Sequence, residues 1–327
     1  MPTNINPPFS CSMVLLTRCM LKCKMCHMWK TESDKNELNI DNWKDAVSAL
    51  CSLFGNSGEI VLSGGEPLLK DGIFDLISFC KKKGLKTIMP SNAFLINGEM
   101  ARKIAGSGLD QISISLDSYC EETHDFIRGV KGAYKRVLDA IDNLKKLNSA
   151  LRIEIITVIS GVNLGEIIEH VEWVKQRGNI DSLYFQTIAC PFFSSADKFW
   201  HNSEEFSFLW PKDMSEMRRI MDNLVQLKER GGMISNSTSQ LKLFKSYFEN
   251  PNKRIGVKKC KLGDFVLNID QAGDVFLCCF DKPVGNIKKD NVKTLWYSQE
   301  AECARDKMHN CGLACNNIVN CFFKEDE

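Results

Sequence analysis

The sequence predicts an α/β protein: a partial (β/α)6 barrel of the TIM type, followed by a small module made of a β-hairpin and a helix. Two observations lead to this prediction. Short apolar runs alternate with amphipathic stretches from Ser12 to Ala189, a pattern that indicates parallel strands with right-handed helical crossovers. The chain has 327 residues, which suits one barrel-sized unit and an additional module.

The expected elements follow from apolar periodicity. Strands are expected at 12–17, 59–63, 85–90, 111–116, 152–159 and 182–189. Helices between them are expected at 73–83, 98–105, 133–147 and 164–176, and later ones at 214–229 and 241–248. We expect the barrel to span 1–230, a connection to span 231–255 and the C-terminal module to span 256–327.

Composition excludes several classes of protein. Lys and Arg number 42 against 41 Asp and Glu, so no overall field attracts nucleic acid or an acidic membrane. The segment from Met1 to Phe9 lacks the basic and apolar regions of a signal peptide, and no apolar run could span a bilayer. The fifteen cysteines are therefore expected in the reducing cytoplasm, where clustered cysteines more often bind metal than form disulfides.

Three cysteines follow the first expected strand with the spacing CxxxCxxC: Cys19, Cys23 and Cys26. Zinc normally takes four protein ligands, whereas an iron-sulfur cube held by three cysteines leaves one iron open to another ligand. A structural zinc loop and three unrelated core cysteines are the alternatives.

A Gly-Gly-Glu-Pro sequence, Gly64 to Pro67, follows the second expected strand. Glycines let a backbone approach a ligand closely, and the carboxylate of Glu66 could accept hydrogen bonds from an ammonium group. Alone, this sequence is also compatible with an ordinary turn.

Together the two motifs resemble the radical S-adenosylmethionine (radical SAM) superfamily. The resemblance implies that the three cysteines hold a 4Fe-4S cluster whose open iron chelates the amino and carboxylate groups of SAM. It implies that the reduced cluster cleaves SAM to a 5'-deoxyadenosyl radical. The chain departs from the family at Met25, where an aromatic residue is usual, and at Ala93, where relatives have the glycine of a Thr-Asn-Gly turn.

The resemblance also implies the SAM contacts. The Gly-Gly-Glu-Pro turn is expected to cradle the methionine amine, and Ser115 with a downstream arginine to hold the carboxylate. Arg128 is our choice for that arginine and Arg136 is the alternative. Thr157 is expected to contact the ribose or adenine. The full expected set is Gly64, Gly65, Glu66, Ser115, Arg128 and Thr157.

Cys190 lies at the end of the sixth expected strand. A thiol there could donate a hydrogen atom to a substrate radical, as a lone thiol does in some radical SAM epimerases. The alternative is a buried small hydrophobe. The stretch from Phe192 to Trp210 is expected to cover the barrel mouth, with His201 as a polar contact.

Seven of the fifteen cysteines lie from Cys260 onwards. A hairpin is expected from strands at 265–269 and 275–277 around a turn ending at Gly273, and a helix at 291–308. This pattern resembles the SPASM or shortened twitch extension of radical SAM enzymes, which implies one auxiliary 4Fe-4S cluster. Its expected ligands are Cys260, Cys278, Cys311 and Cys315, with Cys321 competing for a place. A structural zinc site is the alternative.

The functional expectation is a radical SAM enzyme that takes hydrogen from an unactivated C-H bond of a small polar substrate similar to a sugar or aminocyclitol. The outcome would be dehydrogenation if the auxiliary cluster accepts an electron, or epimerisation if Cys190 returns a hydrogen atom. No extension precedes the first strand to grip a leader peptide, which favours a small molecule. Maturation of a peptide product and a non-catalytic iron-sulfur or zinc scaffold are the alternatives. A reductant such as flavodoxin or ferredoxin is the expected partner.

Overall fold

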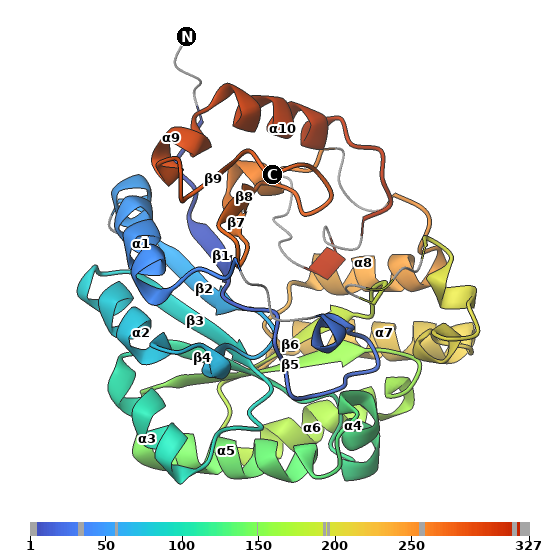
Figure 1. Cartoon of the computed structure of the whole chain (residues 1–327). Helices are drawn as coiled ribbons and strands as arrows, with labels where there is room; N and C mark the ends of the chain where they lie inside the picture. Colours follow the sequence, from blue (N-terminus) through green and yellow to red (C-terminus); the bar gives the residue numbers. More distant parts are fainter. Residues whose placement is uncertain are drawn as a thin grey trace.

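The computed structural model describes residues 5–31, 36–55, 58–148, 150–191, 194, 197–254, 259–315 and 319–320. In this part of the chain, nine strands form one sheet in the order β6-β5-β4-β3-β2-β1-β7-β8-β9 (Figure 1). The strands are β1 Ser10–Val14, β2 Glu59–Ser63, β3 Lys86–Ser91, β4 Gln111–Ser115, β5 Arg152–Ile159, β6 Ser182–Thr187, β7 Val266–Ile269, β8 Asp274–Phe276 and β9 Gly285–Asn286. From β1 to β6 each neighbouring pair is parallel, which confirms the predicted α/β fold.

Helices cover the outside of the curved sheet (Figure 1). They are α1 Ile40–Phe54, α2 Ile73–Lys82, α3 Gly98–Ser107, α4 Glu121–Arg128, α5 Ala133–Leu147, α6 Ile167–Arg177, α7 Met214–Glu229, α8 Thr238–Glu249, α9 Val292–Trp296 and α10 Gln299–His309. The predictions for α5 and α7 coincide with the structure, because both helices carry a clear apolar stripe.

Three predictions of elements need correction. The first strand begins two residues early, at Ser10, and the ladder continues past its end through a bond from the Leu15 N-H to the Ser63 carbonyl at 2.9 Å. Helices α1 and α4 were not predicted, although Asn39 caps α1 by accepting from the Asn42 N-H. The helix expected at 291–308 is two helices, because Ser298 caps a new one by accepting from the Ala301 N-H.

The C-terminal hairpin continues the barrel sheet. Strand β1 pairs in parallel with β2 on one side and with β7 on the other, so that Ser10 faces both Glu59 and Val266. Strands β8 and β9 then add in antiparallel order. The bounds expected for the domains remain a prediction, but in the described chain one sheet runs through both.

The opposite edge, β6, is covered by hydrogen bonds from distant parts of the chain. Leu183 bonds to the backbone at residues 233 and 235. The side-chain amide of Asn236 bonds to both the N-H and the carbonyl of Phe185, at 2.7 and 2.9 Å. The amide of Asn320 does the same for Thr187, at 2.8 and 2.9 Å. Two asparagines therefore take the place of a neighbouring strand and satisfy an otherwise open edge.

Candidate active site

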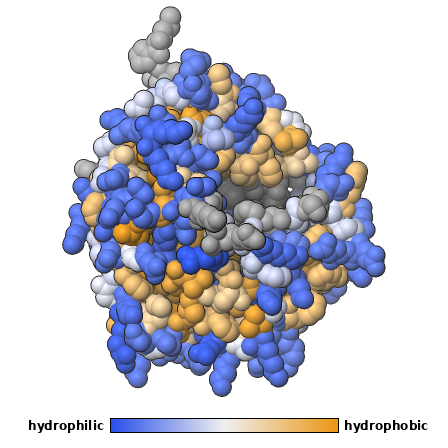
Figure 2. Space-filling model, viewed as in Figure 1, coloured by the Kyte–Doolittle hydropathy of each residue, from blue (hydrophilic) through white to orange (hydrophobic). Residues whose placement is uncertain are grey.

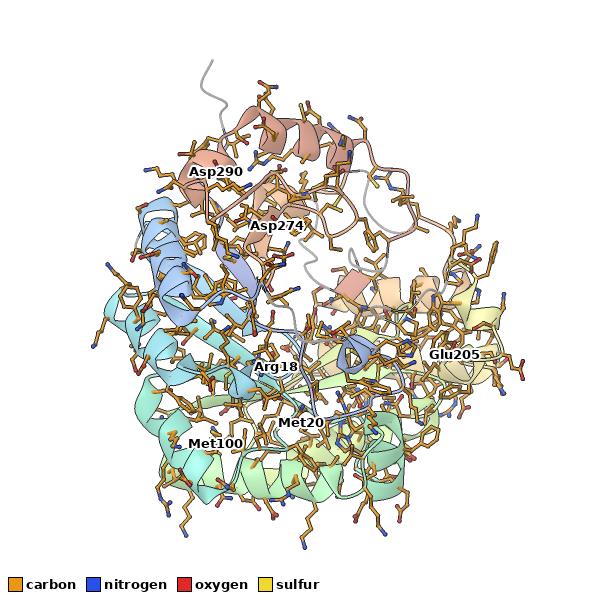
Figure 3. All side chains as sticks on the ribbon, viewed as in Figure 1. Arg18, Met20, Met100, Glu205, Asp274 and Asp290 are labelled. Carbon is orange, nitrogen blue, oxygen red and sulfur yellow. The ribbon has the colours of Figure 1, made fainter. Side chains whose placement is uncertain are left out.

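The loop after β1 lines a cavity at the carboxyl ends of the barrel strands. The cavity has a volume of about 420 Å³, and Cys19, Cys23 and Cys26 all line it. Gln186, Thr187 and Asn320 line it from the β6 side. Figure 2 shows a hollow near the centre of this face, and Figure 3 labels Arg18 and Met20, two residues of the loop after β1. In such barrels the chemistry occurs at the carboxyl ends of the strands, so this cavity is the candidate site.

The two glycines after β2 hold the cysteine loop. The N-H of Gly65 donates to the Leu16 carbonyl, and the N-H of Glu66 donates to the Arg18 carbonyl, both at 2.9 Å. A Cβ on Gly64 would lie 2.3 Å from the Leu16 oxygen, and one on Gly65 would lie 2.1 Å from the Arg18 oxygen. Both glycines line the cavity, as expected. Glycine is required at both positions because the backbone of the cysteine loop leaves no room for a Cβ.

The other side of the loop is held by the end of α4. The N-H groups of Lys22 and Lys24 donate to the carbonyls of Arg128 and Ile127. A Cβ on Gly129 would lie 2.2 Å from the Lys22 oxygen, and Gly129 has φ of 69°. The loop is therefore clamped between the turn after β2 and the carboxyl end of α4.

The side chain of Glu66 lies behind the cavity wall. It is fully buried, and its carboxylate accepts from the N-H groups of Leu68 and Asn92 and from the hydroxyl of Ser91. Burial raises the pKa of Glu66 to about 7. The carboxylate does not line the cavity. In the structure the partners of this carboxylate are Leu68 in the turn after β2 and Ser91 and Asn92 at the end of β3. Its contact with SAM stays a prediction.

That end of β3 brings Asn92 to the cysteines. The Asn92 side-chain amide donates to the sulfurs of Cys19 at 3.5 Å and Met20 at 3.4 Å. Ala93, which stands where the family has glycine, takes a left-handed φ of 59° and is fully buried.

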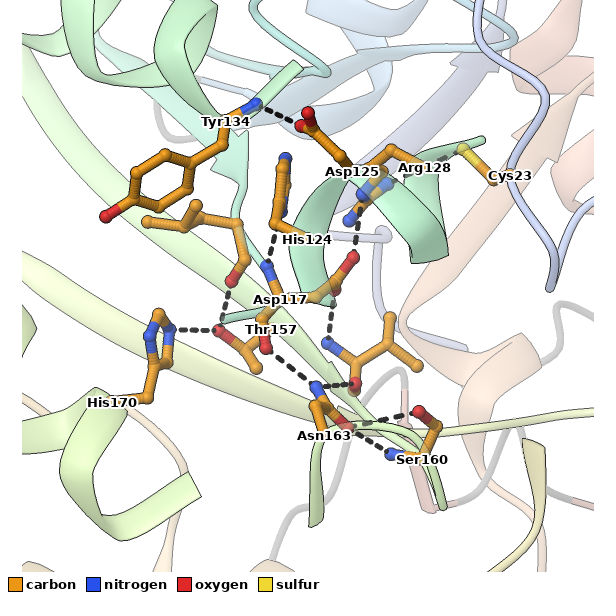
Figure 4. Close-up of polar contacts among 12 residues, drawn as sticks. Cys23, Asp117, His124, Asp125, Arg128, Tyr134, Thr157, Ser160, Asn163 and His170 are labelled. Atoms are coloured by element: carbon orange, nitrogen blue, oxygen red, sulfur yellow. Dashed lines mark hydrogen bonds and ion pairs between the residues drawn. The ribbon is translucent and has the colours of Figure 1, made fainter. Parts of the chain in front are cut away.

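Arg128 joins the cavity to a buried carboxylate (Figure 4). Its Nε lies 2.7 Å from Oδ2 of Asp117, which is fully buried. Its Nη1 lies 4.0 Å from the sulfur of Cys23. Burial raises the pKa of Asp117, and the positive charge of Arg128 opposes that shift. Arg128 lines the cavity as expected, while the alternative, Arg136, lies over the ring of Phe94.

Of the remaining SAM contacts that were expected, Ser115 lines the cavity. Thr157 does not line it: its hydroxyl donates to the Leu116 carbonyl at 2.6 Å and lies 3.0 Å from Nε2 of His170 (Figure 4), so its contact with SAM stays a prediction. Side chains alternate along a strand, so the neighbours Ile156 and Val158 face the cavity while Thr157 faces α6.

Cys190 lies beside the cavity rather than on its wall. The neighbouring Ile188 and Ala189 line the cavity. The Cys190 sulfur is 3.9 Å from the Ser194 hydroxyl, and burial raises its pKa. Tyr247 donates to the Ile188 carbonyl at 3.0 Å, and burial together with the nearby thiols of Cys190 and Cys315 raises its pKa. His201 packs on the ring of Trp210, at 5.2 Å between centroids, instead of lining the cavity.

The structure brings three of the C-terminal cysteines together. Burial raises the pKa of Cys260, and the nearby thiols of Cys278 and Cys311 raise it further. The pKa of Cys278 is lowered to about 6, first by a hydrogen bond with Cys279. Cys315 lies near Tyr247. Cys321 lies outside the described residues.

In the described part of the chain, no three His, Cys, Asp or Glu side chains are arranged to hold one metal ion. In an iron-sulfur cube each thiolate binds a different iron, so its cysteines need not converge on one point. Sequence reasoning missed Gln186 and Asn320 as lining residues, since nothing in their local sequence marks them.

A parallel barrel with three cysteines on one wall of its strand-end cavity, and a further group of cysteines near the C-terminus, is the arrangement expected of a barrel protein that holds iron-sulfur clusters. The model of the radical SAM superfamily matches residues 13–174, and the model of the SPASM iron-sulfur cluster-binding domain matches residues 260–321. The chain belongs to the radical SAM superfamily and carries a SPASM domain. Its cofactors are 4Fe-4S clusters and SAM.

One similar protein is an AdoMet-dependent heme synthase of Methanosarcina barkeri, 27% identical over 302 residues that cover 90% of this chain and 84% of that protein. The fold is similar to that of anSMEcpe with bound AdoMet, with a TM-score of 0.70, 18% identity and coverage of 96% of this chain and 88% of that one. It is also similar to Streptococcus suis SuiB bound to precursor peptide SuiA, with a TM-score of 0.67, 17% identity and coverage of 90% and 66%. Among the described residues no helix has the length and apolar character to cross a membrane.

Proposed function

We propose that this radical SAM enzyme removes a hydrogen atom from an unactivated C-H bond of a small polar substrate and yields a dehydrogenated or epimerised product. The observation that supports this proposal is the cavity itself. Its cysteine wall and its polar wall at β6 face one space of about 420 Å³, so that a cluster and SAM on the first wall would lie opposite hydroxyl and amide groups that suit a polar substrate.

The residues present fit a cluster open on one side. Cys19, Cys23 and Cys26 would be the ligands, and the Asn92 amide already points at the Cys19 sulfur from 3.5 Å. A donor to a ligating sulfur stabilises the thiolate form. When bound and reduced, the cluster supplies the electron that cleaves SAM to the 5'-deoxyadenosyl radical.

Arg128 would hold the carboxylate of SAM with the N-H groups of its guanidinium that are not paired with Asp117. Because Nε is paired with Asp117, the orientation of the side chain is fixed before any ligand arrives. Ser115, Gly64 and Gly65 line the same space and would complete the binding site.

Charge on the cavity wall argues against a polyanionic substrate. Among the described residues that line it, Arg128 alone carries a permanent charge, and Asp117 neutralises it. The other polar lining groups, such as Gln186, Thr187 and Asn320, are hydroxyls and amides. These groups suit a neutral substrate with hydroxyl or amine groups, because a buried anion needs a paired cation.

The C-terminal cysteines would supply the electron acceptor for an oxidation. Cys260, Cys278 and Cys311 would be three ligands of the auxiliary cluster, and Cys315 and Cys321 remain candidates for the fourth. If Cys190 instead gives a hydrogen atom to the substrate radical, the product is an epimer.

A peptide substrate is the second candidate. SuiB bound to precursor peptide SuiA has the same fold, as has anSMEcpe with bound AdoMet and the Cp18Cys peptide. Both likenesses, under 20% identity, concern the fold alone. The cytoplasmic location and the flavodoxin or ferredoxin partner also remain predictions.

The test is anaerobic reconstitution with iron and sulfide, followed by SAM and dithionite, with 5'-deoxyadenosine as the measured product. The wild-type enzyme should form it, and the variant with alanine at all three loop cysteines should not. A fully loaded wild-type protein that forms none would refute the proposal and favour a non-catalytic scaffold. Screening sugars, aminocyclitols and short peptides for stimulated SAM cleavage then separates the substrate classes.

A further inference from the structure

Three segments of the C-terminal module meet at Gly263. This glycine lies three residues after Cys260, in the buried centre of the short 3-10 turn Leu262–Asp264. A Cβ on Gly263 would lie 2.7 Å from the sulfur of Met308 in α10 and 3.3 Å from the Cβ of Leu277. The turn, the helix and the end of the hairpin are therefore in direct contact, and glycine is the residue that lets them approach.

Each of these segments carries one expected ligand of the auxiliary cluster. Cys260 precedes the turn, and Cys278 directly follows Leu277. Cys311 lies just beyond α10, where its N-H donates to the Met308 carbonyl at 3.1 Å. The contacts between the segments therefore lie within three residues of three thiols, and they set how far apart those thiols stand.

Arg305 of α10 ties the turn to the helix. Its side chain is only 3% exposed. Its Nε donates to the Gly263 carbonyl and its Nη2 donates to the Trp296 carbonyl, both at 2.9 Å. The guanidinium also lies 4.2 Å from the centre of the Trp296 ring. A planar group held by two carbonyls and one ring has a fixed orientation, so the position of the turn is fixed as well.

The turn that Arg305 holds also contacts the thiol of Cys260. Burial raises the pKa of this thiol, and a hydrogen bond from the Leu262 backbone opposes the shift. Asp264, at the end of the turn, has its Oδ2 2.9 Å from Nε2 of His309 in α10 and its Oδ1 3.9 Å from Nε of Arg305. A buried guanidinium needs such a carboxylate nearby. The helix therefore holds the turn at a carbonyl and at a side chain.

We propose that Arg305 is a positioning residue for the auxiliary cluster. Through the Gly263 carbonyl it holds the turn after Cys260 against α10, and so keeps that thiol at the distance from the other two thiols that one 4Fe-4S cluster requires. This inference rests on the proposed function, since it takes from it the ligands Cys260, Cys278 and Cys311, but it requires neither SAM cleavage nor a substrate.

The physical reason is preorganisation. Ligands that are already in place lose less conformational entropy when the group they bind arrives. Without the bond from Arg305, the turn would become ordered only as the cluster is inserted, so the cluster would be held less tightly. Lysine is no equal substitute, because it lacks the rigid fork that donates to both carbonyls in one orientation.

The experiment uses the full chain with alanine at Cys19, Cys23 and Cys26, so that the auxiliary cluster is the one cluster measured. Into this background are introduced Arg305→Gln, Arg305→Lys or, as the control, Lys293→Gln, which removes an exposed cation from the neighbouring helix α9. After anaerobic reconstitution three quantities are measured: iron and sulfide per chain, the EPR spectrum of the dithionite-reduced cluster, and the rate at which a chelator removes iron.

Arg305→Gln should lose iron to the chelator about ten- to a hundredfold faster, because hydrogen bonds from a charged donor contribute about that factor to the hold on the turn. Its EPR spectrum should change as well, since one ligand of the cluster moves. Arg305→Lys should fall between Arg305→Gln and the background chain. Lys293→Gln should match the background chain in all three measurements.

A second pair of variants tests the same contact by adding bulk. Gly263→Ala places a methyl group against the sulfur of Met308, and the further change Met308→Ala removes that sulfur. Gly263→Ala should therefore speed the loss of iron and alter the EPR spectrum, and the double variant should recover part of the difference. Added bulk and a removed charge are different perturbations, so agreement between the two series identifies the position of the turn as the cause.

Equal iron content, EPR spectrum and chelator rate in Arg305→Gln and Lys293→Gln would overturn the proposal. A lower thermal midpoint of Arg305→Gln with an unchanged EPR spectrum and chelator rate would also overturn it, because Arg305 would then serve packing alone. Absence of iron from the background chain would do the same, since there would be no cluster to position. Failure of the loaded wild-type enzyme to form 5'-deoxyadenosine would refute the proposed function and leave this proposal intact.

Discussion

Substitution of Glu66 by glutamine tests whether this carboxylate contacts SAM or holds the turn beside it. Its two oxygens accept three hydrogen bonds, from Leu68, Ser91 and Asn92. A glutamine has one acceptor oxygen, so its amide would face a backbone N-H, donor against donor. Loss of a charge-assisted bond costs about 1.5–3 kcal/mol.

The same substitution removes an ionisation that opposes folding. The pKa of Glu66 rises from 4.5 to about 7 because the group is fully buried. Above pH 4.5 the unfolded chain loses this proton first, so the stability of the wild-type protein falls as pH rises toward 7. The full effect is about 3.4 kcal/mol, and about 2 kcal/mol of it falls between pH 5.5 and 8. The Glu66→Gln protein has no carboxyl group to ionise at this position, so its stability does not fall in this way as pH rises. At pH 8 this gain in stability offsets the cost of the lost hydrogen bond.

The assay is the thermal midpoint of the anaerobic holoenzyme from pH 5.5 to 8, with Glu172→Gln on the surface of α6 as the control. About 2 kcal/mol corresponds to about 3 °C for a chain of this length. The midpoint of the wild-type enzyme should therefore fall by about 3 °C relative to that of Glu66→Gln as pH rises. Affinity for SAM should change by less than about threefold, because the carboxylate lies outside the cavity; direct contact would cost about ten- to a hundredfold. Two results together would refute this reasoning: a large loss of SAM affinity in Glu66→Gln, and a difference in thermal midpoint between this variant and the wild-type enzyme that does not change with pH.

Three further predictions follow from the site. Asn320→Ala leaves the N-H and carbonyl of Thr187 without the partner that Asn320 provides. The free energy of unfolding should fall by about 2–4 kcal/mol, which lowers the thermal midpoint by about 3–6 °C. Substitution of the exposed Asn310 by alanine is the control, and equal midpoints for the two variants would contradict the role of Asn320 at the β6 edge. Alanine at all three cysteines of the first loop should abolish SAM cleavage while iron and sulfide remain at the C-terminal site, and loss of all iron would mean that no independent auxiliary cluster exists. If Cys190 is a hydrogen donor, turnover in deuterated water places one deuterium in the product and Cys190→Ala stops inversion but not SAM cleavage; a product without solvent deuterium would leave dehydrogenation.

The sequence predicted motifs whose role depends on the backbone better than it predicted contacts between side chains. The spacing of Cys19, Cys23 and Cys26 placed all three on one cavity wall, as expected. The Gly64-Gly65 pair was also predicted at that wall, although its closest neighbour is the cysteine loop. The face of β5 on which Thr157 lies could not be predicted, because that strand carries apolar residues on both faces and its sequence does not distinguish the cavity side from the helix side.

The sequence by itself predicted the six parallel strands and most of the helices between them, and it marked two groups of cysteines, because periodicity and motif spacing are local properties of the chain. Only the tertiary structure decided what each polar side chain meets. Glu66 turned toward Asn92, 26 residues away, and Asn320 reached Thr187, 133 residues away. A buried donor or acceptor forms a hydrogen bond with a partner that lies near it in the folded chain. Which residues lie near one another depends on how the sheet curves, and the local sequence does not specify it.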